Sequence, residues 1–431
     1  SDPMSVAATP TTRPGLALPV IRRWRLGATF AVLSLLSLLL IGIDPAPATV
    51  TFRLAEKHDA VRLADIDLPA VATGWVLSAL MLLLAVWALM RGARGANPPV
   101  WASTLFWAAF VVAMLVWAVS HADAHSLSLP GLLAGSLALS VPLIFGSMSG
   151  LLCERSGVVN IAIEGQLLFG AFAAAVVGTV THSAWAGLAA AMIGAMLVSL
   201  ILAVFSIRYL VNQVIVGVVV NVLVSGLTGF LYSTVLSRQA TTLNSPEHLP
   251  DWSVPGLSRI PVIGPVLFDQ SLLVYVMFGV VALIWYGLNR TRWGLRTRAV
   301  GEHPQAADTL GVNVNRLRFG NVLLAGAVAG MGGAFFTLVS VSAFNKDMTA
   351  GQGYIALAAL IFGRWRPGGA LCAALLFGFA TNLQSVLSLL GTTVPSQFLA
   401  MLPYVVTVAA VTGLVGRTRG PAASGQPYVK E

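Results

Sequence analysis

The stretch RSGVVNIAIEGQLLFG, residues 155–170, decides how the fold is understood, because it carries Asn160 and Glu164 inside an apolar run. Residues 158–181 have the length and hydropathy of a membrane-spanning helix. On such a helix Glu164 would lie roughly 9–10 Å along the axis from Val158, with Asn160 on the same face. A carboxylate in hydrocarbon costs roughly 2.5–3.5 kcal/mol, so its presence there indicates a function.

Composition places the whole chain in the membrane class. Of its 431 residues, 57% are hydrophobic and 10% are charged, against roughly 25% charged in a typical soluble domain. A chain this apolar cannot cover itself with polar surface, so lipid is its solvent. The net charge of +9 comes from basic residues between apolar runs, which indicates membrane topology and no nucleic-acid partner. The predicted fold class is an all-α polytopic membrane protein.

Apolar runs of membrane length predict the spans. The candidates are residues 26–43, 72–90, 100–120, 131–152, 158–181, 184–207, 211–236, 271–289, 319–341, 353–363, 369–389 and 397–416. The run 353–363 is too short to cross alone, and with 369–389 it can form a hairpin around GRWRPGG, residues 363–369. We therefore expect a helical bundle of about 10–12 transmembrane spans with broken or re-entrant helices.

Loop charges predict the orientation of the spans. Arginine-rich segments before the first span and after the second, sixth, eighth, tenth and last alternate with mixed or acidic loops such as 44–71 and 237–270. Twelve crossings then put both termini in the cytoplasm. The apolar core of residues 22–48 is longer than a usual signal-peptide core, so a signal anchor is favoured over a cleaved signal peptide. Residues 1–3, before Met4, are interpreted as an expression remnant.

The residue patterns of an enzyme or metal site are missing from the sequence. There is no P-loop pattern GxxxxGK[ST], no HExxH, no Cys/His metal spacing and no nucleophile elbow. Cys153 and Cys372 lie at the ends of apolar runs, and we expect free thiols. We expect no catalytic residue, no metal and no cofactor on this chain, which disfavours a membrane-embedded enzyme or scaffold.

Several predicted spans carry polar faces. In residues 212–229 these recur at spacings of three and four, and the face consists of Gln213, Gly217, Asn221, Ser225 and Thr228. Other polar positions are Ser136, Ser140 and Ser147 around Pro142, and Thr381, Asn382, Gln384 and Ser388. For Ser, Thr and Gly, hydrogen bonding or packing between helices is the favoured interpretation, as it is for GAVAGMGG, residues 326–333.

Four residues are the candidates for a transport pathway: Asn160, Glu164, Gln213 and Asn221. For Asn221 a pathway role and simple helix joining are equally supported. For Glu164 function is favoured, while a structural role, bonding loop amides or pairing with Arg155, stays open.

The loop after the eighth span contains GEHPQAADTLG, residues 301–311, which predicts a short helix. Pro304 suits its first turn, Glu302 its positive end and Gly311 its stop. This helix of about seven residues would lie along the membrane surface, where it can dock on a soluble partner. From the residues alone, a lipid-surface loop whose six arginines only follow the positive-inside rule is slightly favoured over docking.

Three ordered motifs carry a resemblance to a known family. RSGVVNIAIEGQLLFGAFAA (155–174), AVGEHPQAADTLGVNVNRLRFGNVLLAGAVAGMGGAF (299–335) and GYIALAALIFGRWRPGGALCAALLFG (353–378) resemble the permeases of bacterial ABC importers for simple sugars and nucleosides. NIAIEG is similar to the nucleoside branch. The resemblance covers residues 131–416 as a permease core. It leaves an N-terminal tail, 1–25, a three-span extension, 26–120, and a C-terminal tail, 417–431, with both tails expected in the cytoplasm.

The resemblance implies partners and residue roles. A permease of this family works with a cytoplasmic ATPase that binds ATP and magnesium, an extracytoplasmic binding protein, and a second permease, more often a related chain than an identical copy. The coupling-helix motif falls on Gly301, Glu302, His303, Ala306, Ala307 and Gly311. Asn160 and Glu164 match NIxxEG, whereas Ala162 and His303 depart from the residues usual at their positions.

The favoured function is therefore a permease subunit in the bacterial inner membrane that transports nucleosides or simple sugars and is not itself an enzyme. The alternative is an ion-coupled secondary transporter that uses Glu164 as a proton or sodium site.

Overall fold

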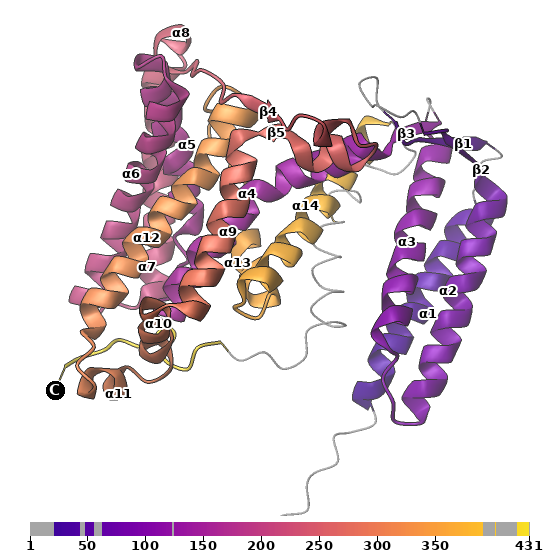
Figure 1. The fold of residues 1–431 in the computed structure, drawn as a ribbon, viewed down its shortest axis with the longest axis horizontal. Helices are drawn as coiled ribbons and strands as arrows, with labels where there is room; N and C mark the ends of the chain where they lie inside the picture. The colour runs from indigo at the N-terminus through magenta and orange to yellow at the C-terminus, as the bar shows by residue number, and fades with distance from the viewer. Residues whose placement is uncertain are drawn as a thin grey trace, which may run out of the picture. The chain divides into compact units, whose positions relative to one another are not determined.

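The computed structural model describes residues 21–43, 48–55, 63–122, 125–390, 401 and 420–430. Within them, ten helices are long and apolar enough to cross a membrane, which confirms the all-α polytopic class (Figure 1). Apart from residue 401, the predicted span 397–416 lies outside the described residues. The chain folds into two compact units, residues 1–48 with 69–120 and residues 49–68 with 121–431. The predicted division at residues 26–120 and 131–416 stays a prediction.

The first unit is a bundle of three helices, α1 (Ile21–Ile43), α2 (Ala70–Ala93) and α3 (Val100–Ser120). Its core joins Phe30 of α1, Met81 of α2 and Phe106 of α3, all of them buried. The rings of Phe30 and Phe106 stack with centroids 3.9 Å apart, and the buried hydroxyls of Ser37 and Ser78 lie 2.7 Å apart. All three helices are of membrane length, as the sequence predicted.

The second unit holds the other long helices. They are α4 (Leu129–Arg155), α5 (Ile163–Val180), α6 (Ala184–Ala203), α7 (Gln213–Leu231), α9 (Leu272–Arg290), α12 (Val314–Phe335) and α14 (Pro367–Leu389). Shorter helices are α8 (Ala240–Leu243), α10 (Arg292–Glu302), α11 (Pro304–Thr309) and α13 (Gln352–Phe362). π-helical turns extend α6, α7 and α12 as η1 (Val204–Arg208), η2 (Tyr232–Leu236) and η5 (Phe336–Ser340).

Short elements lie between the helices. The strands are β1 (Thr49–Arg53), β2 (Ile66–Pro69), β3 (Ser126–Ser128), β4 (Asp251–Ser253) and β5 (Asp269–Ser271). They form a three-stranded sheet in the order β2-β1-β3, with β1 and β3 parallel, and an antiparallel pair of β4 and β5. The 3₁₀ turn η3 (Leu257–Arg259) and the π-helical turn η4 (Gly264–Phe268) complete the loop between β4 and β5.

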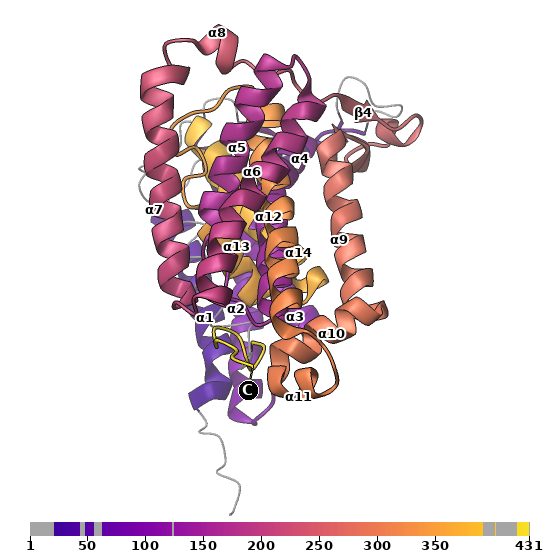
Figure 2. The same cartoon turned by 90° about the vertical axis from the view of Figure 1, so that its left-hand side faces the viewer.

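Helix α12 is the centre of the second unit and packs on α4, α5 and α6 (Figure 2). Its glycines allow this close approach: a Cβ at Gly330 would lie 2.3 Å from the carbonyl oxygen of Ala191 on α6, and one at Gly333 would lie 2.2 Å from that of Leu167 on α5. The interpretation of residues 326–333 as a packing motif is therefore confirmed.

Two spans of the second unit are interrupted. Helix α4 ends at Arg155, residues 156–162 form no helix, and α5 begins only at Ile163. The prediction of one helix over 158–181 with Asn160 and Glu164 on a shared face is therefore wrong, because Asn160 precedes the helix and Glu164 lies in its first turn. Helix α13 has 11 residues and is followed by α14 after a turn at residues 363–366. The predicted hairpin around GRWRPGG is confirmed.

Candidate functional site

Glu164 joins the two interrupted spans. Both oxygens of its carboxylate accept hydrogen bonds from the segment that begins α13. Oε1 accepts from the Thr349 hydroxyl at 2.6 Å and from the Gly351 amide at 2.8 Å, and Oε2 accepts from the Gly353 amide at 2.6 Å. These amides belong to the first turn of α13 and the residue before it, where no helical carbonyl can accept them. The carboxylate of α5 is thus the cap of α13.

The depth of this contact follows from placing the turn at 363–366, which carries Arg364 and Arg366, at the membrane surface. Its last residue, Phe362, is next to the turn at 363–366, and 11 helical residues extend about 16 Å. Since the hydrocarbon layer is about 30 Å thick, the start of α13 lies roughly half-way across it. Helix ends at this depth need protein groups to satisfy their backbone, and Glu164 is such a group.

Helix α7 holds the irregular segment 156–162 from the other side. The Gln213 side chain accepts a hydrogen bond from the Val159 amide at 2.7 Å. The Asn221 side chain accepts from the Gly165 amide at 2.8 Å and donates to the Ile161 carbonyl at 2.9 Å and to the Tyr354 hydroxyl at 3.0 Å. Two polar residues of the predicted α7 face therefore bond the backbone where α5 begins.

Asn160 belongs to a separate buried network. It is fully buried, and its amide donates to Gln166 at 3.1 Å and to Ser149 at 3.3 Å. Gln166 in turn donates to the side chains of Asn160 at 3.2 Å and Ser199 at 2.8 Å. The network joins α4, α5 and α6 to the irregular segment.

The four predicted pathway residues are thus divided between two groups. Glu164, Gln213 and Asn221 bond the backbone where the interrupted helices begin, and Asn160 lies in the buried network. The loop-amide role left open for Glu164 matches its hydrogen bonds, while Arg155 donates to the carbonyl of Trp365, with Nε at 2.9 Å. The assignment of the four residues to a substrate pathway stays a prediction.

Other members of the polar faces form hydrogen bonds between helices, to a loop or within their own helix. Asn382 of α14 donates to the Leu132 carbonyl of α4 at 2.7 Å and to the Ser136 hydroxyl at 3.2 Å. Ser140 and Thr228 donate to carbonyls one turn back in their own helices. Ser225 donates to Asp347 at 2.6 Å.

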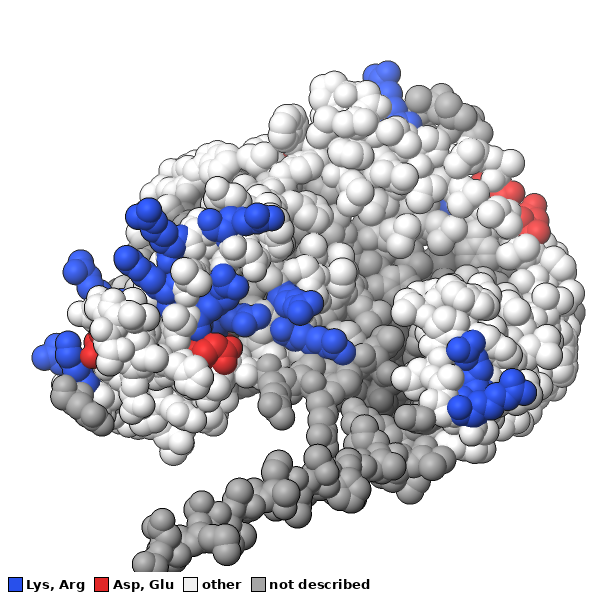
Figure 3. Space-filling model, turned by 60° about the horizontal axis from the view of Figure 1, so that its bottom comes forward, with Lys and Arg blue, Asp and Glu red and all other residues white. Residues whose placement is uncertain are grey.

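The predicted short helix is α11. It begins at Pro304 and ends at Thr309, and Gly311 follows with φ of +79°. Helix α10 precedes it, so the segment 292–311 is a helical pair at the end of the second unit where α4 and α9 also end, which we call the arginine-rich end. Lys and Arg side chains gather on this face, with few acidic ones (Figure 3).

The six predicted coupling residues differ in exposure. Gly301 and Ala307 are buried, and a Cβ at Gly301 would lie 2.3 Å from the carbonyl oxygen of Arg155. Glu302, His303, Ala306 and Gly311 are exposed, as is the neighbouring Leu310, at 84% of its surface. The buried pair fixes α10 and α11 on the core, and the exposed residues are available to a partner.

The C-terminal residues 420–430 contact the same segment, which the sequence did not predict. The Ala423 amide donates to the Gly301 carbonyl at 2.9 Å, and Tyr428 packs with Val300, Ala307 and Val314. Buried Arg318 of α12 donates to the carbonyls of Ser156 at 3.1 Å and Gln426 at 2.9 Å. The sequence of this segment has no helical or strand periodicity, so its packing against α10 and α11 could be seen only in the structure.

The part of the chain that the structure describes, with its interrupted spans, its short helical pair and ten membrane-length helices, is that of a multi-pass membrane protein. The family described as branched-chain amino acid transport system, permease component, matches residues 132–411, and the chain belongs to it. It is thus a transporter permease subunit and not by itself an enzyme.

Curated relatives refine this membership. The chain is 39% identical over 304 residues to the guanosine ABC transporter permease protein NupQ of Bacillus subtilis, covering 68% of this chain and 95% of the relative. It is 40% identical over 309 residues to the nucleoside ABC transporter permease protein NupC of Lactococcus lactis, covering 69% and 96%. A putative glucose ABC transporter permease of Haloferax volcanii is 32% identical over 70% of this chain and 98% of the relative. These relatives support the ABC permease function over the ion-coupled alternative. No solved structure matches the chain.

Proposed function

We propose that this chain is a membrane subunit of an ABC importer for nucleosides. The observation that carries the proposal is the match, along nearly their whole length, to two relatives whose names specify guanosine and nucleoside transport. In this proposal a separate ATPase binds ATP and magnesium, and an extracytoplasmic binding protein delivers the substrate. The arginine-rich end faces the cytoplasm, following the positive-inside rule.

The docking surface for the ATPase is the exposed part of residues 302–311. Leu310 is a large apolar side chain exposed at 84%, on a surface otherwise rich in charge. An apolar anchor surrounded by polar residues is the usual centre of a protein interface. Buried Gly301 and Ala307 hold this surface rigidly on α4 and α12, so that a movement of the ATPase is transmitted to the helices.

The second permease is proposed to be a related, non-identical chain. The chain also resembles the guanosine permease NupP of Bacillus subtilis, at 27% identity over 247 residues, and the nucleoside permease NupB of Lactococcus lactis, at 30% over 115. Each organism thus has two different permeases similar to this chain. Affinity purification of the tagged chain from its native membrane should recover a second permease of different mass together with an ATPase.

Uptake tests the proposed function. Native cells lacking this chain should fail to accumulate labelled nucleoside, and the wild-type chain should restore uptake. Uptake should stop when the ATPase is inactivated and should persist when an ionophore collapses the ion gradients while ATP is maintained. Uptake that needs the gradient and not the ATPase would contradict the proposal.

A pair of matched variants tests the docking surface. Leu310→Asp should abolish uptake and release the ATPase from the purified complex, because it puts a charge at the centre of the interface. Leu257→Asp changes another exposed leucine, 42% exposed in η3, and should leave both unchanged. Equal effects of the two variants would contradict docking at residues 302–311.

A further inference from the structure

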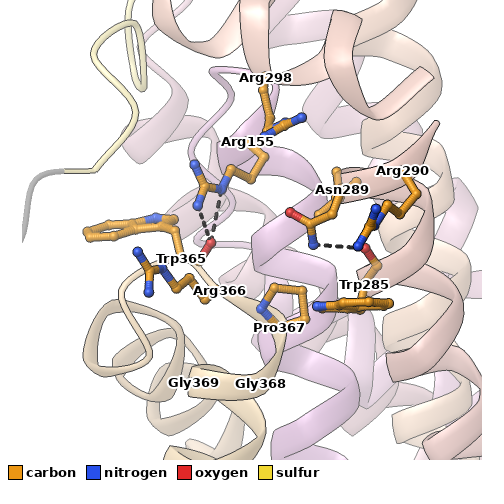
Figure 4. Close-up of a pocket in the computed structure, with 11 residues that line it drawn as sticks. Arg155, Trp285, Asn289, Arg290, Arg298, Trp365, Arg366, Pro367, Gly368 and Gly369 are labelled. Carbon is orange, nitrogen blue, oxygen red and sulfur yellow. Dashed lines mark hydrogen bonds between the residues drawn. The ribbon is translucent and has the colours of Figure 1, made fainter. Parts of the chain in front are cut away.

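A cavity of about 650 Å³ lies at the arginine-rich end, between the ends of α4 and α9 and the start of α14. Four arginines line it, each from a different element: Arg155 of α4, Arg290 of α9, Arg298 of α10 and Arg366 before α14. Trp285 and Trp365 complete its walls, and the side chains surround a common space (Figure 4). The transport function described above uses none of these residues.

The positive charge of this cavity is only partly balanced, because in the described part of the chain Glu302 is the one acid whose charge acts on Arg155, while Arg298 and Arg366 repel it. Among the described residues, no carboxylate lies within ion-pair distance of these four arginines. Two acids of this end of the unit bond other groups: Glu154 accepts from the Trp365 indole, and Glu302 accepts from the Ala422 amide at 3.2 Å. Four cationic groups with no paired carboxylate repel one another, and an anion between them reduces that repulsion.

The start of α14 adds to the attraction for an anion. Pro367, Gly368 and Gly369 of its first turn line the cavity, and no described side chain caps this 23-residue helix. Its first amides therefore lack intrahelical acceptors and carry the positive end of the helix dipole. Nothing lies within 4 Å of a Cβ added at Gly368, so an anion can approach the amide there closely.

An apolar hollow adjoins the cavity. It has a volume of about 590 Å³, shares Arg366 and Gly369 with the first cavity and is lined at the same end by Arg364, while the rest of its lining is apolar. From there Cys372, Ala373 and Leu376 continue along one face of α14, at helical spacing, opposite Phe362 of α13. On α9, exposed Trp285 and Tyr286 lie in the last turns before Arg290, as aromatic residues do at a membrane interface.

We propose that this place is a binding site for an anionic phospholipid. Its phosphate lies among Arg155, Arg290, Arg298 and Arg366, and an acyl chain lies along α14 in the apolar hollow. A free phosphate would occupy the charged cavity and leave the hollow empty, so the combination favours a lipid. Basic pockets between membrane helices recognise anionic head groups in this way.

Native mass spectrometry of the purified full-length chain tests the proposal. The chain is titrated with phosphatidylglycerol and, separately, with phosphatidylcholine of the same acyl chains. The double variant Arg290→Gln and Arg366→Gln should weaken phosphatidylglycerol binding about tenfold or more. The matched control is Arg292→Gln with Arg296→Gln, which removes two arginines of α10 outside the cavity and should retain wild-type binding.

A second variant separates the lipid from free phosphate. Cys372 is exposed in the apolar hollow, and Cys372→Trp should block the acyl chain, weakening phosphatidylglycerol binding without changing the four arginines. Equal binding of the two lipids by the wild-type chain would overturn the proposal, as would equal losses in the two arginine double variants. If inorganic phosphate displaces the lipid and Cys372→Trp has no effect, the site is a phosphate site and the lipid assignment is wrong.

Discussion

The carboxylate of Glu164 is tolerated in the membrane because the protein supplies its donors. Insertion of such a group costs roughly 2.5–3.5 kcal/mol. Hydrogen bonds to charged groups contribute about 1.5–3 kcal/mol each, and Glu164 accepts three. The amides of Gly351 and Gly353 would otherwise be unpaired at membrane depth. The balance therefore favours a carboxylate at this position, whether or not substrate also contacts it.

Removal of this cap should destabilise the fold. Glu164→Ala leaves two amides and one hydroxyl without an acceptor, and each unsatisfied buried group costs about 1–3 kcal/mol. Glu164→Gln retains one acceptor oxygen and should lose less. Thermal unfolding in detergent should rank wild type above the Gln variant and the Gln variant above the Ala variant. An Ala variant as stable as wild type would contradict the capping role.

The absence of a side chain at Gly353 allows the start of α13 to approach Glu164 closely enough to be capped. A Cβ there would lie 2.4 Å from the backbone nitrogen of Glu164 and 2.5 Å from its Cα. Gly353→Ala should therefore lower stability by about 1–3 kcal/mol through overpacking. In α9, Gly279 has nothing within 4 Å of an added Cβ, so Gly279→Ala should be neutral or stabilising by about 0.5–1 kcal/mol. Thermal unfolding in detergent compares the two variants. Equal changes in stability would show that the close approach of Gly353 to the Glu164 backbone does not affect stability.

The sequence identified the costly polar residues of the site but not the side chains that form hydrogen bonds with them. Asn160, Glu164, Gln213 and Asn221 could be identified because a polar group in an apolar run is costly. Thr349, Ser149, Gln166 and Ser199 were not identified, because Ser, Thr and Gln have many inconspicuous roles in helices. These side chains matter because of hydrogen bonds to residues far away in sequence, up to 185 positions for Thr349 and Glu164. Helical periodicity describes only residues close in sequence and cannot predict such bonds.

At the scale of elements, apolar length predicted the helices but not the interruption of α5. Residues 158–162 are as apolar as a helix, so hydropathy continues across the break. Side chains of α7 bond the backbone of Val159 and Ile161 in this segment and of Gly165 in the first turn of α5. These bonds replace the hydrogen bonds that a continuous helix would form. Gly157, with φ of +89°, turns the chain out of α4. The short helix α11 was predictable because Pro304 and Gly311 are local signals.

The C-terminal segment should stabilise the coupling helices. It bonds Gly301, packs Tyr428 on Ala307 and accepts from Arg318, so its removal exposes the inner side of α10 and α11. In a chain truncated after residue 419, hydrogen exchange should become faster over residues 300–312. Exchange in α1–α3, which belong to the first unit, should be unchanged and serves as the internal control. Unchanged exchange over 300–312 would contradict the role.

At the scale of the molecule, the division into units agrees with the extent of the relatives. The family match covers residues 132–411, and the guanosine and nucleoside permeases are matched along 95% and 96% of their length by about two thirds of this chain. The three helices α1–α3 have their own core of Phe30, Met81 and Phe106. The part of the chain that the family model matches therefore lies in the second unit.

This division predicts that residues 121–431 fold without the first unit. The truncation removes α1–α3 together with β1 and β2, which belong largely to residues 49–68 of the second unit. The pairing of β1 with β3 involves three residue pairs, and the core of α4, α5, α6 and α12 stays complete. The shortened chain should insert in the membrane, elute as a single species and melt within a few degrees of the full chain, while restoring uptake in cells that lack it. As a control, removal of residues 367–431, which deletes α14 from the second unit, should abolish folding because α14 packs along α4. Aggregation of the 121–431 chain would show that α1–α3 are required by the permease fold.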